Sequence, residues 1–517
     1  MNVLIINLTR FGDLIQTQPV ISGYKSLGHR VGLVCLTNFA SAATLLDGVD
    51  AVFPFPGPKL LAQLDKDWRL AINDATAFKR DVLEQFQPDR TVNLTPSIAS
   101  RLMTRELAPE SGDVVGFSVD EFGFNADTSS WAAYLQMAGG NRGASPFNIC
   151  DIFRRTAGLK DEGNSLVLAR PGDEEMSRAD ELLRLEKFSG ASGFIALQMG
   201  ASEERRRWPV NRFVETANMV WEQDGLVPVM LGTKGESTLG ERFEELANCP
   251  SVNLIGATSL TELAGVLCRC EALVTNDTGT MHLAAGLGVP SCSVFLATAQ
   301  PWDTGPYRAG NICLEPDVDC HPCGFGTECP HAHTCRESIS SEAMCGYLHY
   351  LLKGEECDSF PGTRAWLTRS GSDGFMELEA LSGHDVSDRA LWITVQRTHY
   401  LRFLDGDPVG GKTGLAEKIS AEVTEDISKT LTSAHDMLFL LSQQGLLLAR
   451  NPRPQAKKKF LVSWQRIQNL LASNRYLNML GLLWMFESQR HENDLASLLE
   501  LTERFQGLFS SLRDEFV

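Results

Sequence analysis

The strongest constraint on the fold is an alternation of short apolar, β-rich runs with helical segments, which occurs twice along the chain. Such an alternation implies βαβ units whose strands run parallel. We therefore predict an α/β fold with two doubly wound, Rossmann-like sheets in tandem. The strands are predicted at 3–7, 30–36, 51–55, 90–94 and 114–117, and then at 193–198, 227–231, 252–255, 272–275 and 291–295. Helices are predicted between them, at 18–26, 78–86, 212–223, 260–267 and 281–287.

Beyond about residue 360 the pattern changes to helices alone. A Gly- and Ser-containing break at 370–374 precedes apolar residues at helical spacing, and a second break falls at 451–454. Because one core rarely exceeds roughly 250–300 residues, a chain of 517 residues needs several domains. We predict an N-terminal Rossmann-like domain at 1–170, a second at 171–355 and a helical C-terminal extension at 356–517. Its helices are expected at 415–448, 460–486 and 495–516.

The charge and the N-terminus exclude several classes of protein. A formal charge of -18 argues against a nucleic-acid partner, because polyanions attract clustered Lys and Arg. The apolar runs are shorter than the roughly 20 residues that span a bilayer, and the first residues lack the features of a signal peptide. We expect a cytoplasmic protein, at most peripheral at the inner face of the inner membrane. The basic run 457–459 is either a solvated helix end or a contact with anionic lipid or lipopolysaccharide.

The first motif with chemical potential follows the first predicted strand. The loop carries Thr9 and Arg10, turns at Gly12 and enters a helix at Asp13. Ligands of open α/β sheets bind at the carboxyl ends of the strands, where this loop lies. Asp13 suits a helix start on structural grounds alone, because it complements the helix dipole. It also suits a general base facing the cleft between the two domains, and the two interpretations are compatible.

The second motif is a run of three arginines, 205–207, which follows the strand at 193–198 and precedes Trp208 and Pro209. Guanidinium groups bind phosphate through paired hydrogen bonds. In an acidic chain, adjacent arginines at the carboxyl end of a strand indicate phosphate binding. A solvated loop is the alternative.

The third motif lies where the strand at 272–275 runs into a Gly-containing turn and an Ala-rich helix. Unpaired N–H groups at such a helix start, aided by the helix dipole, suit a diphosphate. Thr278 and Thr280 flank Gly279 and add hydroxyl donors. Asp277 is a candidate helix cap or ribose ligand, and His282 is either structural or a phosphate or sugar contact.

The fourth motif is a group of four cysteines within 16 residues: Cys320, Cys323, Cys329 and Cys335. Four thiolates at such spacing can surround one tetrahedral zinc or iron ion. We predict such a closed, structural metal site, with no role in activating water. Four ordinary thiols, or a disulfide formed after isolation, are the alternatives.

Together these motifs resemble glycosyltransferase family 9, the ADP-heptose:lipopolysaccharide heptosyltransferases, and in particular its heptosyltransferase-II-like members. The resemblance runs from Met1 to about residue 350. Its most specific part is 275–285, and the segment 255–263 and the four-cysteine segment also resemble the family. The family's opening motif is matched by Gly12, Asp13, Thr17 and Pro19. The helical extension lies outside the pattern.

The resemblance implies a GT-B fold, in which two Rossmann-like domains face a cleft, and an inverting transfer of heptose from ADP-heptose to lipopolysaccharide core or a related glycan. Asp13 would be the general base, with Thr9, Arg10 and Gly12 in the acceptor loop. Arg206, where the family usually has Lys, would hold the diphosphate. Thr278, Gly279, Thr280 and His282 would do so at the helix start, and Asp277 would contact the donor sugar or ribose.

A helix start and a guanidinium stabilise the charge of a leaving diphosphate, so the implied reaction requires no cofactor. Three alternatives stay open. A close variant would transfer heptose to a protein such as an autotransporter or flagellin. A sugar-nucleotide epimerase would share the architecture. A non-catalytic scaffold would keep the fold and bind partners through its C-terminal helices.

Overall fold

A computed structural model describes residues 1–140, 145–160, 166–491 and 494–516. The chain divides into two compact units, each of which gathers two stretches of sequence. Unit 1 comprises Met1–Val115 and Asn148–Gly383, and unit 2 comprises Gly116–Phe147 and His384–Val517. Each unit is described by itself below.

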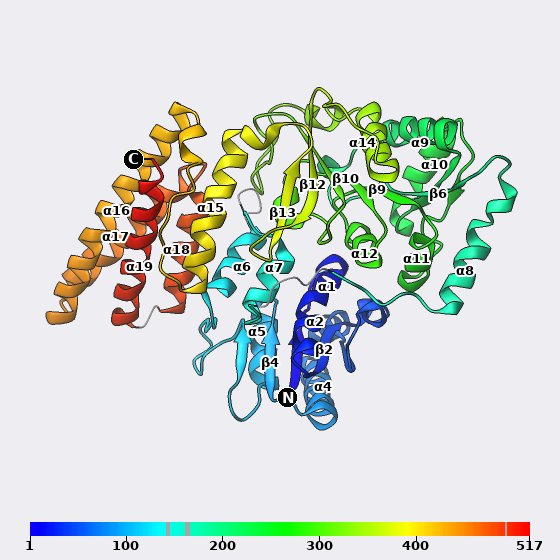
Figure 1. Cartoon of the computed structure of the whole chain (residues 1–517). Coiled ribbons are helices and arrows are strands. Elements are labelled where there is room, and N and C mark those ends of the chain that lie inside the picture. The colour runs from blue at the N-terminus through cyan, green and yellow to red at the C-terminus, as the bar shows by residue number, and fades with distance from the viewer. Residues whose placement is uncertain (141–144, 161–165, 492–493, 517) are drawn as a thin grey trace. The chain divides into compact units, whose positions relative to one another are not determined.

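Unit 1 begins with a five-stranded sheet of order β3-β2-β1-β4-β5. The central strand β1 pairs in parallel with β2 on one side and β4 on the other. Figure 1 shows the helices of this region packed around the sheet. The strands are β1 (Asn2–Ile6), β2 (Arg30–Leu36), β3 (Ala51–Phe55), β4 (Arg90–Asn93) and β5 (Val114–Gly116), and the helices are α1 (Phe11–Ile15), α2 (Gln18–Ser26), α3 (Gly57–Leu64), α4 (Trp68–Phe86) and α5 (Ile98–Leu107).

The second sheet of unit 1 has eight strands in the order β13-β12-β11-β10-β9-β6-β7-β8. The pairs from β11 to β8 are parallel, so the predicted α/β class with parallel strands is confirmed. These strands are β6 (Gly193–Gln198), β7 (Leu226–Leu231), β8 (Val252–Asn253), β9 (Ala272–Asn276), β10 (Ser291–Val294) and β11 (Ile312–Pro316). The other helices of unit 1 are α7 (Ile149–Thr156), α8 (Asp173–Leu183), α9 (Val210–Asp224), α10 (Ser237–Leu246), α11 (Leu260–Leu267), α12 (Gly279–Leu287), α13 (Pro301–Thr304) and α14 (Ser341–Lys353).

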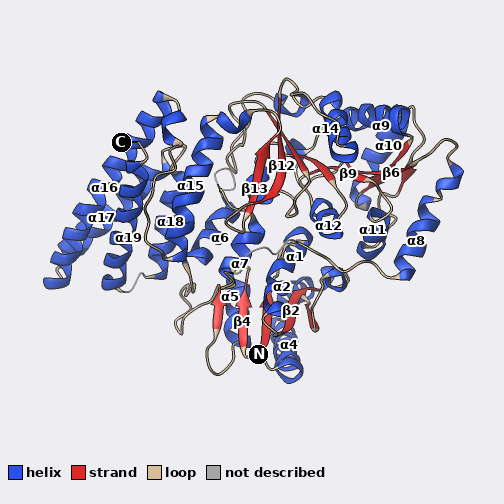
Figure 2. Cartoon of the chain, in the orientation of Figure 1, coloured by secondary structure: helices blue, strands red, loops and turns tan. Residues whose placement is uncertain are grey.

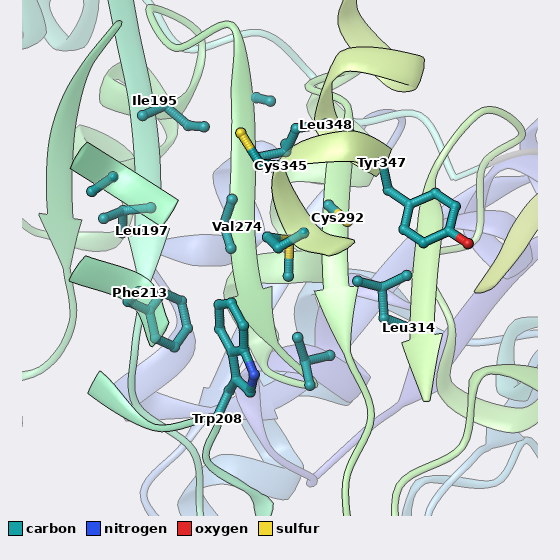
Figure 3. Packing of buried hydrophobic residues seen from close by; sticks show 14 of the residues in the cluster. Ile195, Leu197, Trp208, Phe213, Val274, Cys292, Leu314, Cys345, Tyr347 and Leu348 are labelled. Atoms are coloured by element: carbon teal, nitrogen blue, oxygen red, sulfur yellow. The ribbon is translucent and has the colours of Figure 1, made fainter. Parts of the chain in front are cut away.

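The core of this sheet is built from its apolar strands and from the helices that cover it. Trp208 and Phe213 pack edge to face, with ring centroids 5.0 Å apart. Figure 3 shows both rings beside Val274 of β9, with Cys292 and Leu314 on the neighbouring strands. Burial of this apolar surface is the dominant favourable term that holds helices and sheet together.

Two strands lie where helices were expected after residue 360. β12 (Thr363–Ser370) pairs antiparallel with β11, and β13 (Met376–Ala380) pairs antiparallel with β12. The predicted break at 370–374 is the turn between them, closed by a hydrogen bond from the Gly371 N–H to the Phe375 carbonyl. The hairpin is held to the sheet by the indole of Trp366, which donates to buried Glu315 at 2.9 Å.

Unit 2 is helical, so the predicted C-terminal helices are confirmed as a class (Figure 2). The single helix expected at 460–486 is wrong, because the chain turns at Asn474, whose side-chain oxygen accepts the N–H groups of Tyr476 and Leu477. Gly481 allows the two resulting helices to approach closely, since a Cβ there would lie 2.9 Å from the Ala472 nitrogen. The helices are α6 (Ser130–Gly140), α15 (Asp388–Asp405), α16 (Ala421–Arg450), α17 (Pro454–Ala472), α18 (Asn478–Arg490) and α19 (Leu495–Asp514).

Helix α6 reaches unit 2 from a distant part of the sequence. The Trp131 indole donates to Asp405 at 2.8 Å, and the Ser130 hydroxyl donates to buried Glu487 at 3.2 Å. The division into domains at 1–170, 171–355 and 356–517 stays a prediction, because these compact units cut the chain at other places. Among the described residues, no helix is both long and apolar enough to cross a membrane.

Candidate active site

The strand orders of unit 1 define where a ligand can bind. In the eight-stranded sheet β6 lies between β7 and β9, so the chain reverses direction across the sheet at the β6–β9 pair. In the five-stranded sheet the same reversal occurs at the β1–β4 pair. Open α/β sheets bind ligands at the carboxyl ends of strands beside such a switch point. The loops after β1, β6 and β9 are therefore the candidate site, and they carry the predicted residues.

The loop after β1 fixes the backbone at Asp13. Buried Asn7 donates to the Asp13 carbonyl at 3.2 Å and to the Thr17 hydroxyl at 2.7 Å. The Thr17 hydroxyl donates to the same carbonyl at 3.1 Å, and Thr9 donates to the Asn7 side chain. Arg10, in extended conformation, is the residue before α1. The Asp13 carboxylate, in the first turn of α1, is thus carried by a braced loop rather than by a mobile one.

Two glycines bring α1 and α12 into contact within unit 1. A Cβ on Gly12 would lie 3.3 Å from the Gly279 Cα and 3.3 Å from the His282 ring. A Cβ on Gly279 would lie 2.7 Å from the ring of Phe11 and 3.3 Å from the Gly12 nitrogen. These distances leave no ordinary room for a side chain at either position. The start of α12 therefore lies against the turn of chain that carries Asp13.

The start of α12 has the features expected of an anion site. Thr278 is the residue before the first turn, and its side chain does not cap the helix; its hydroxyl lies 3.2 Å from that of Thr275. The Thr280 hydroxyl donates to Gln198 at the end of β6. His282 is buried in the first turn, beside Gly12. Because N–H groups at a helix start point outward and the dipole adds positive charge, this geometry suits a phosphate group.

Arg206 is the arginine of the triplet that reaches this helix start. Its guanidinium forms a partly buried ion pair with Asp277 and donates to the Ser202 hydroxyl at 3.2 Å. The Thr304 hydroxyl donates to the same Asp277 oxygen at 3.3 Å. The sequence predicted separate roles for Arg206 and Asp277, whereas the structure shows them paired with each other. Asp277 holds the guanidinium beside Thr278 and Gly279 and fixes its orientation.

The other two arginines point elsewhere. Arg205 pairs with Glu203 at 2.7 Å and donates to the Thr327 carbonyl in the four-cysteine segment. Arg207 donates to the Ala201 carbonyl at 3.1 Å. These two side chains therefore brace the loops around the site.

Asn276 and Thr304 are site residues for which the sequence predicted no role. Buried Asn276 donates to the carbonyls of Met199 and Gly200 and accepts the Trp208 N–H at 2.8 Å. It therefore joins the loop after β6 to the loop after β9. The sequence feature that could have identified Asn276 is its position at the end of β9, directly before Asp277. For Thr304, which reaches Asp277 from α13, no local signal exists.

The four cysteines line one cavity of about 330 Å³ within unit 1. Burial raises the pKa of the Cys335 thiol to about 11, and the neighbouring cysteines add to the shift. No cysteine is in a disulfide, yet among the described residues no three His, Cys, Asp or Glu side chains form a group that could hold a metal ion. The structural zinc or iron ion stays a prediction. The cavity is lined by Arg205, Ala297, Val318, Asp319, Cys320, Cys323, Thr327, Cys329, His331, His333, Thr334 and Cys335.

Two Rossmann-like sheets in tandem are the arrangement of the GT-B fold. The crystal structure of a glycosyltransferase of family 9 from Veillonella parvula superposes on the chain with a TM-score of 0.53 at 18% identity, over 68% of this chain and 97% of that one, which supports this fold. Residues 161–333 match the sequence profile of glycosyltransferase family 9 (heptosyltransferase).

Two curated relatives are similar to part of this chain. The chain is 31% identical to lipopolysaccharide heptosyltransferase 2 of Escherichia coli over 34% of its own length and 54% of that protein's. It is 31% identical to lipooligosaccharide heptosyltransferase 2 of Haemophilus influenzae over 24% of its length and 38% of that protein's. The alignments thus span between about a third and a half of these relatives.

Proposed function

We propose that this chain is an inverting glycosyltransferase that moves heptose from ADP-heptose to a hydroxyl of lipopolysaccharide core or a related glycan. The observation that carries the proposal is the contact of Gly12 with Gly279, which places the loop bearing Asp13 against the anion-binding start of α12. A donor diphosphate at α12 and an acceptor hydroxyl near Asp13 would then be neighbours. The named relatives, both heptosyltransferases, support heptose as the sugar.

In the proposed reaction, the Asp13 carboxylate takes the proton of the acceptor hydroxyl. The hydroxyl oxygen attacks the anomeric carbon from the face opposite the diphosphate and forms the new C–O bond. The bond from that carbon to the diphosphate breaks, its electron pair leaves with ADP, and the configuration inverts. A base within hydrogen-bond reach of the hydroxyl contributes on the order of 10²–10⁴ in rate.

The residues on the donor side would stabilise the charge that develops on the diphosphate. The first N–H groups of α12, the hydroxyls of Thr278 and Thr280, and His282 would contact phosphate oxygens. Arg206, oriented by Asp277, would add positive charge. Fixed groups of this kind are effective because they need no reorganisation as the bond breaks. Asp277 would also reach the ribose or the sugar when the donor is bound.

The test is ADP release from ADP-heptose, with lipopolysaccharide core that lacks its heptose as acceptor. We expect acceptor-dependent release by the wild type and a loss of at least about a hundredfold in Asp13→Asn. Donor binding, measured by calorimetry, should be retained in that variant, because Asp13 lies on the acceptor side. Asp65→Asn, at an exposed aspartate outside the site, is the matched control.

Two results would contradict the proposal. Full activity of Asp13→Asn would show that Asp13 is not the general base. No release from any ADP-, UDP- or GDP-sugar by a folded protein would favour the non-catalytic scaffold instead. Release that occurs only with a polypeptide acceptor would keep the chemistry but replace the glycan acceptor with a protein.

A further inference from the structure

The hairpin of α16 and α17 carries an unusual charge pattern. Asp and Glu make up 65 of the 517 residues, roughly one in eight, yet none occurs between Asp436 and Glu487. The same stretch holds seven Lys and Arg residues. Five of them cluster at the end of the hairpin, and all five are exposed: Arg450, Arg453, Lys457, Lys458 and Lys459. In a chain of charge -18, this is a local surface of opposite sign.

Large apolar side chains are exposed on the same part of the hairpin. Leu447 is 63% exposed, Leu446 is 45% exposed, and Leu461 and Val462 on the facing helix are 51% and 43% exposed. Two helical turns before Leu446 and Leu447, Phe439 and Leu440 add further exposed apolar surface. Side chains of this size are normally buried, and a contiguous exposed set marks a surface that another body covers.

The apolar and cationic groups lie close together because of how the hairpin packs. A Cβ on Gly445 would lie 3.2 Å from the ring of Phe460, so α16 and α17 touch at this pair. Leu446 and Leu447 directly follow Gly445, and Leu461 and Val462 directly follow Phe460. The five cations lie on the stretch of chain between these two pairs. At 1.5 Å rise per residue, all of them fall within roughly 10 Å of the hairpin end along the helix axes. Figure 1 shows the hairpin at the edge of unit 2, farthest from α15.

We propose that the end of the α16–α17 hairpin is a docking surface for an anionic lipid bilayer. Exposed Leu and Val side chains would enter the interface of the bilayer while the surrounding cations contact anionic headgroups, the combination that holds peripheral helices on membranes. A cluster of like charges on a stretch of chain without acidic residues suits a uniformly anionic surface better than a protein interface, where charges of both signs alternate. The inference goes beyond sugar transfer and does not depend on the donor or the acceptor.

The experiment is sedimentation of the full chain with vesicles of phosphatidylcholine containing 30% phosphatidylglycerol. We expect binding that weakens at high salt and is lost on pure phosphatidylcholine. In Lys457→Gln/Lys458→Gln/Lys459→Gln the partition coefficient should fall by roughly a hundredfold, since each cation near the surface contributes a factor of about five. The matched control is Lys66→Gln/Lys187→Gln/Lys429→Gln, which removes the same charge from exposed, scattered positions and should bind like the wild type.

A second variant tests the apolar part. Leu447→Ser/Leu461→Ser changes two exposed side chains, so its helical circular dichroism should match the wild type while vesicle binding falls at least about tenfold. Absence of binding to the anionic vesicles, or equal binding to neutral ones, would overturn the proposal. Equal losses in the clustered and scattered lysine variants would do the same. A discrete dimer in sedimentation equilibrium that the Leu variant abolishes, without vesicle binding, would assign the surface to a second copy of the chain.

Discussion

At the residue scale, the contact of Gly12 with Gly279 imposes the strictest requirement on the site. In Gly279→Ala the new Cβ would meet the Phe11 ring at 2.7 Å and the Gly12 nitrogen at 3.3 Å. The ring can shift, but the backbone can do so only by moving the Asp13 loop away from α12. We expect ADP release to fall at least about tenfold and the free energy of unfolding to fall by about 1–3 kcal/mol, measured by turnover and by denaturant titration.

Relief of the ring contact in Phe11→Ala/Gly279→Ala should restore part of the activity. The matched control is Gly507→Ala, at a helical glycine whose Cβ would meet nothing within 4 Å; it should leave turnover unchanged. An active Gly279→Ala enzyme would show that the two loops do not need this close approach.

The residue types of the site could be predicted from the sequence, but their partners could not. Asp13, Thr278 and Gly279 lie where a predicted strand is followed by a turn and a helix start, and local pattern is enough to find such positions. The pairing of Arg206 with Asp277 joins residues 71 positions apart, and the choice of Arg206 over Arg205 and Arg207 depends on how two loops fold over each other. Only the three-dimensional packing decides such contacts.

At the element scale, buried parallel strands were predictable and the edge hairpin was not. Strands β2, β3 and β6 are short apolar runs between turn residues, so their bounds agree with the prediction. β13 is the edge strand of its sheet, with β12 beside it. β13 alternates buried or half-buried residues with exposed acidic ones, so only one of its sides has an apolar pattern. Their sequences therefore lack the continuous apolar signal that marks a central strand.

Glu515 ties α15 to the chain end within unit 2. It accepts hydrogen bonds of 2.8 Å from His399 Nε2 and from the N–H and hydroxyl of Thr413. Burial alone would raise the pKa of this carboxyl, but these bonds lower it below the ordinary 4.5. A depressed pKa stabilises the fold above pH 4.5, and this contribution is lost as the pH falls through the lower, folded value.

We therefore expect Glu515→Gln to lower the free energy of unfolding by about 1–3 kcal/mol at pH 7. The difference from the wild type should shrink below about pH 4.5, where the wild-type carboxyl begins to take up a proton. Denaturant titrations at pH 7 and at acid pH measure this, with exposed Glu500→Gln as control. A difference that is constant with pH would rule out the charge of Glu515 as the cause.

The four-cysteine segment gives a prediction about the metal content of the purified chain. If its thiols bind zinc or iron, elemental analysis of the purified chain will find about one ion per molecule. Cys320→Ser/Cys323→Ser should then lose the ion and the stability that it adds, because metal binding is coupled to folding. Cys249→Ser, outside the cavity, should keep it. If the wild type is fully folded without metal, the metal prediction is wrong and the four thiols contribute only packing.

At the scale of the whole molecule, the two compact units have separate cores. Trp208 is buried in unit 1 against Phe213. Trp484 is buried in unit 2, with its ring centroid 5.1 Å from that of Phe505. Each of these ring contacts lies within one unit, so each indole reports on the stability of its own unit.

We expect calorimetry to resolve two unfolding transitions, and each tryptophan variant to lower only one of them. Trp208→Ala and Trp484→Ala should each cost about 3–5 kcal/mol, the usual loss when a large buried ring is removed. Only Trp208→Ala should also weaken ADP-heptose binding, because loss of the buried indole would loosen the segment whose backbone N–H donates to Asn276 at the loops after β6 and β9. One transition that both variants lower equally would mean that the stretch 116–147, which leaves unit 1 to pack in unit 2, couples the two cores into a single cooperative structure.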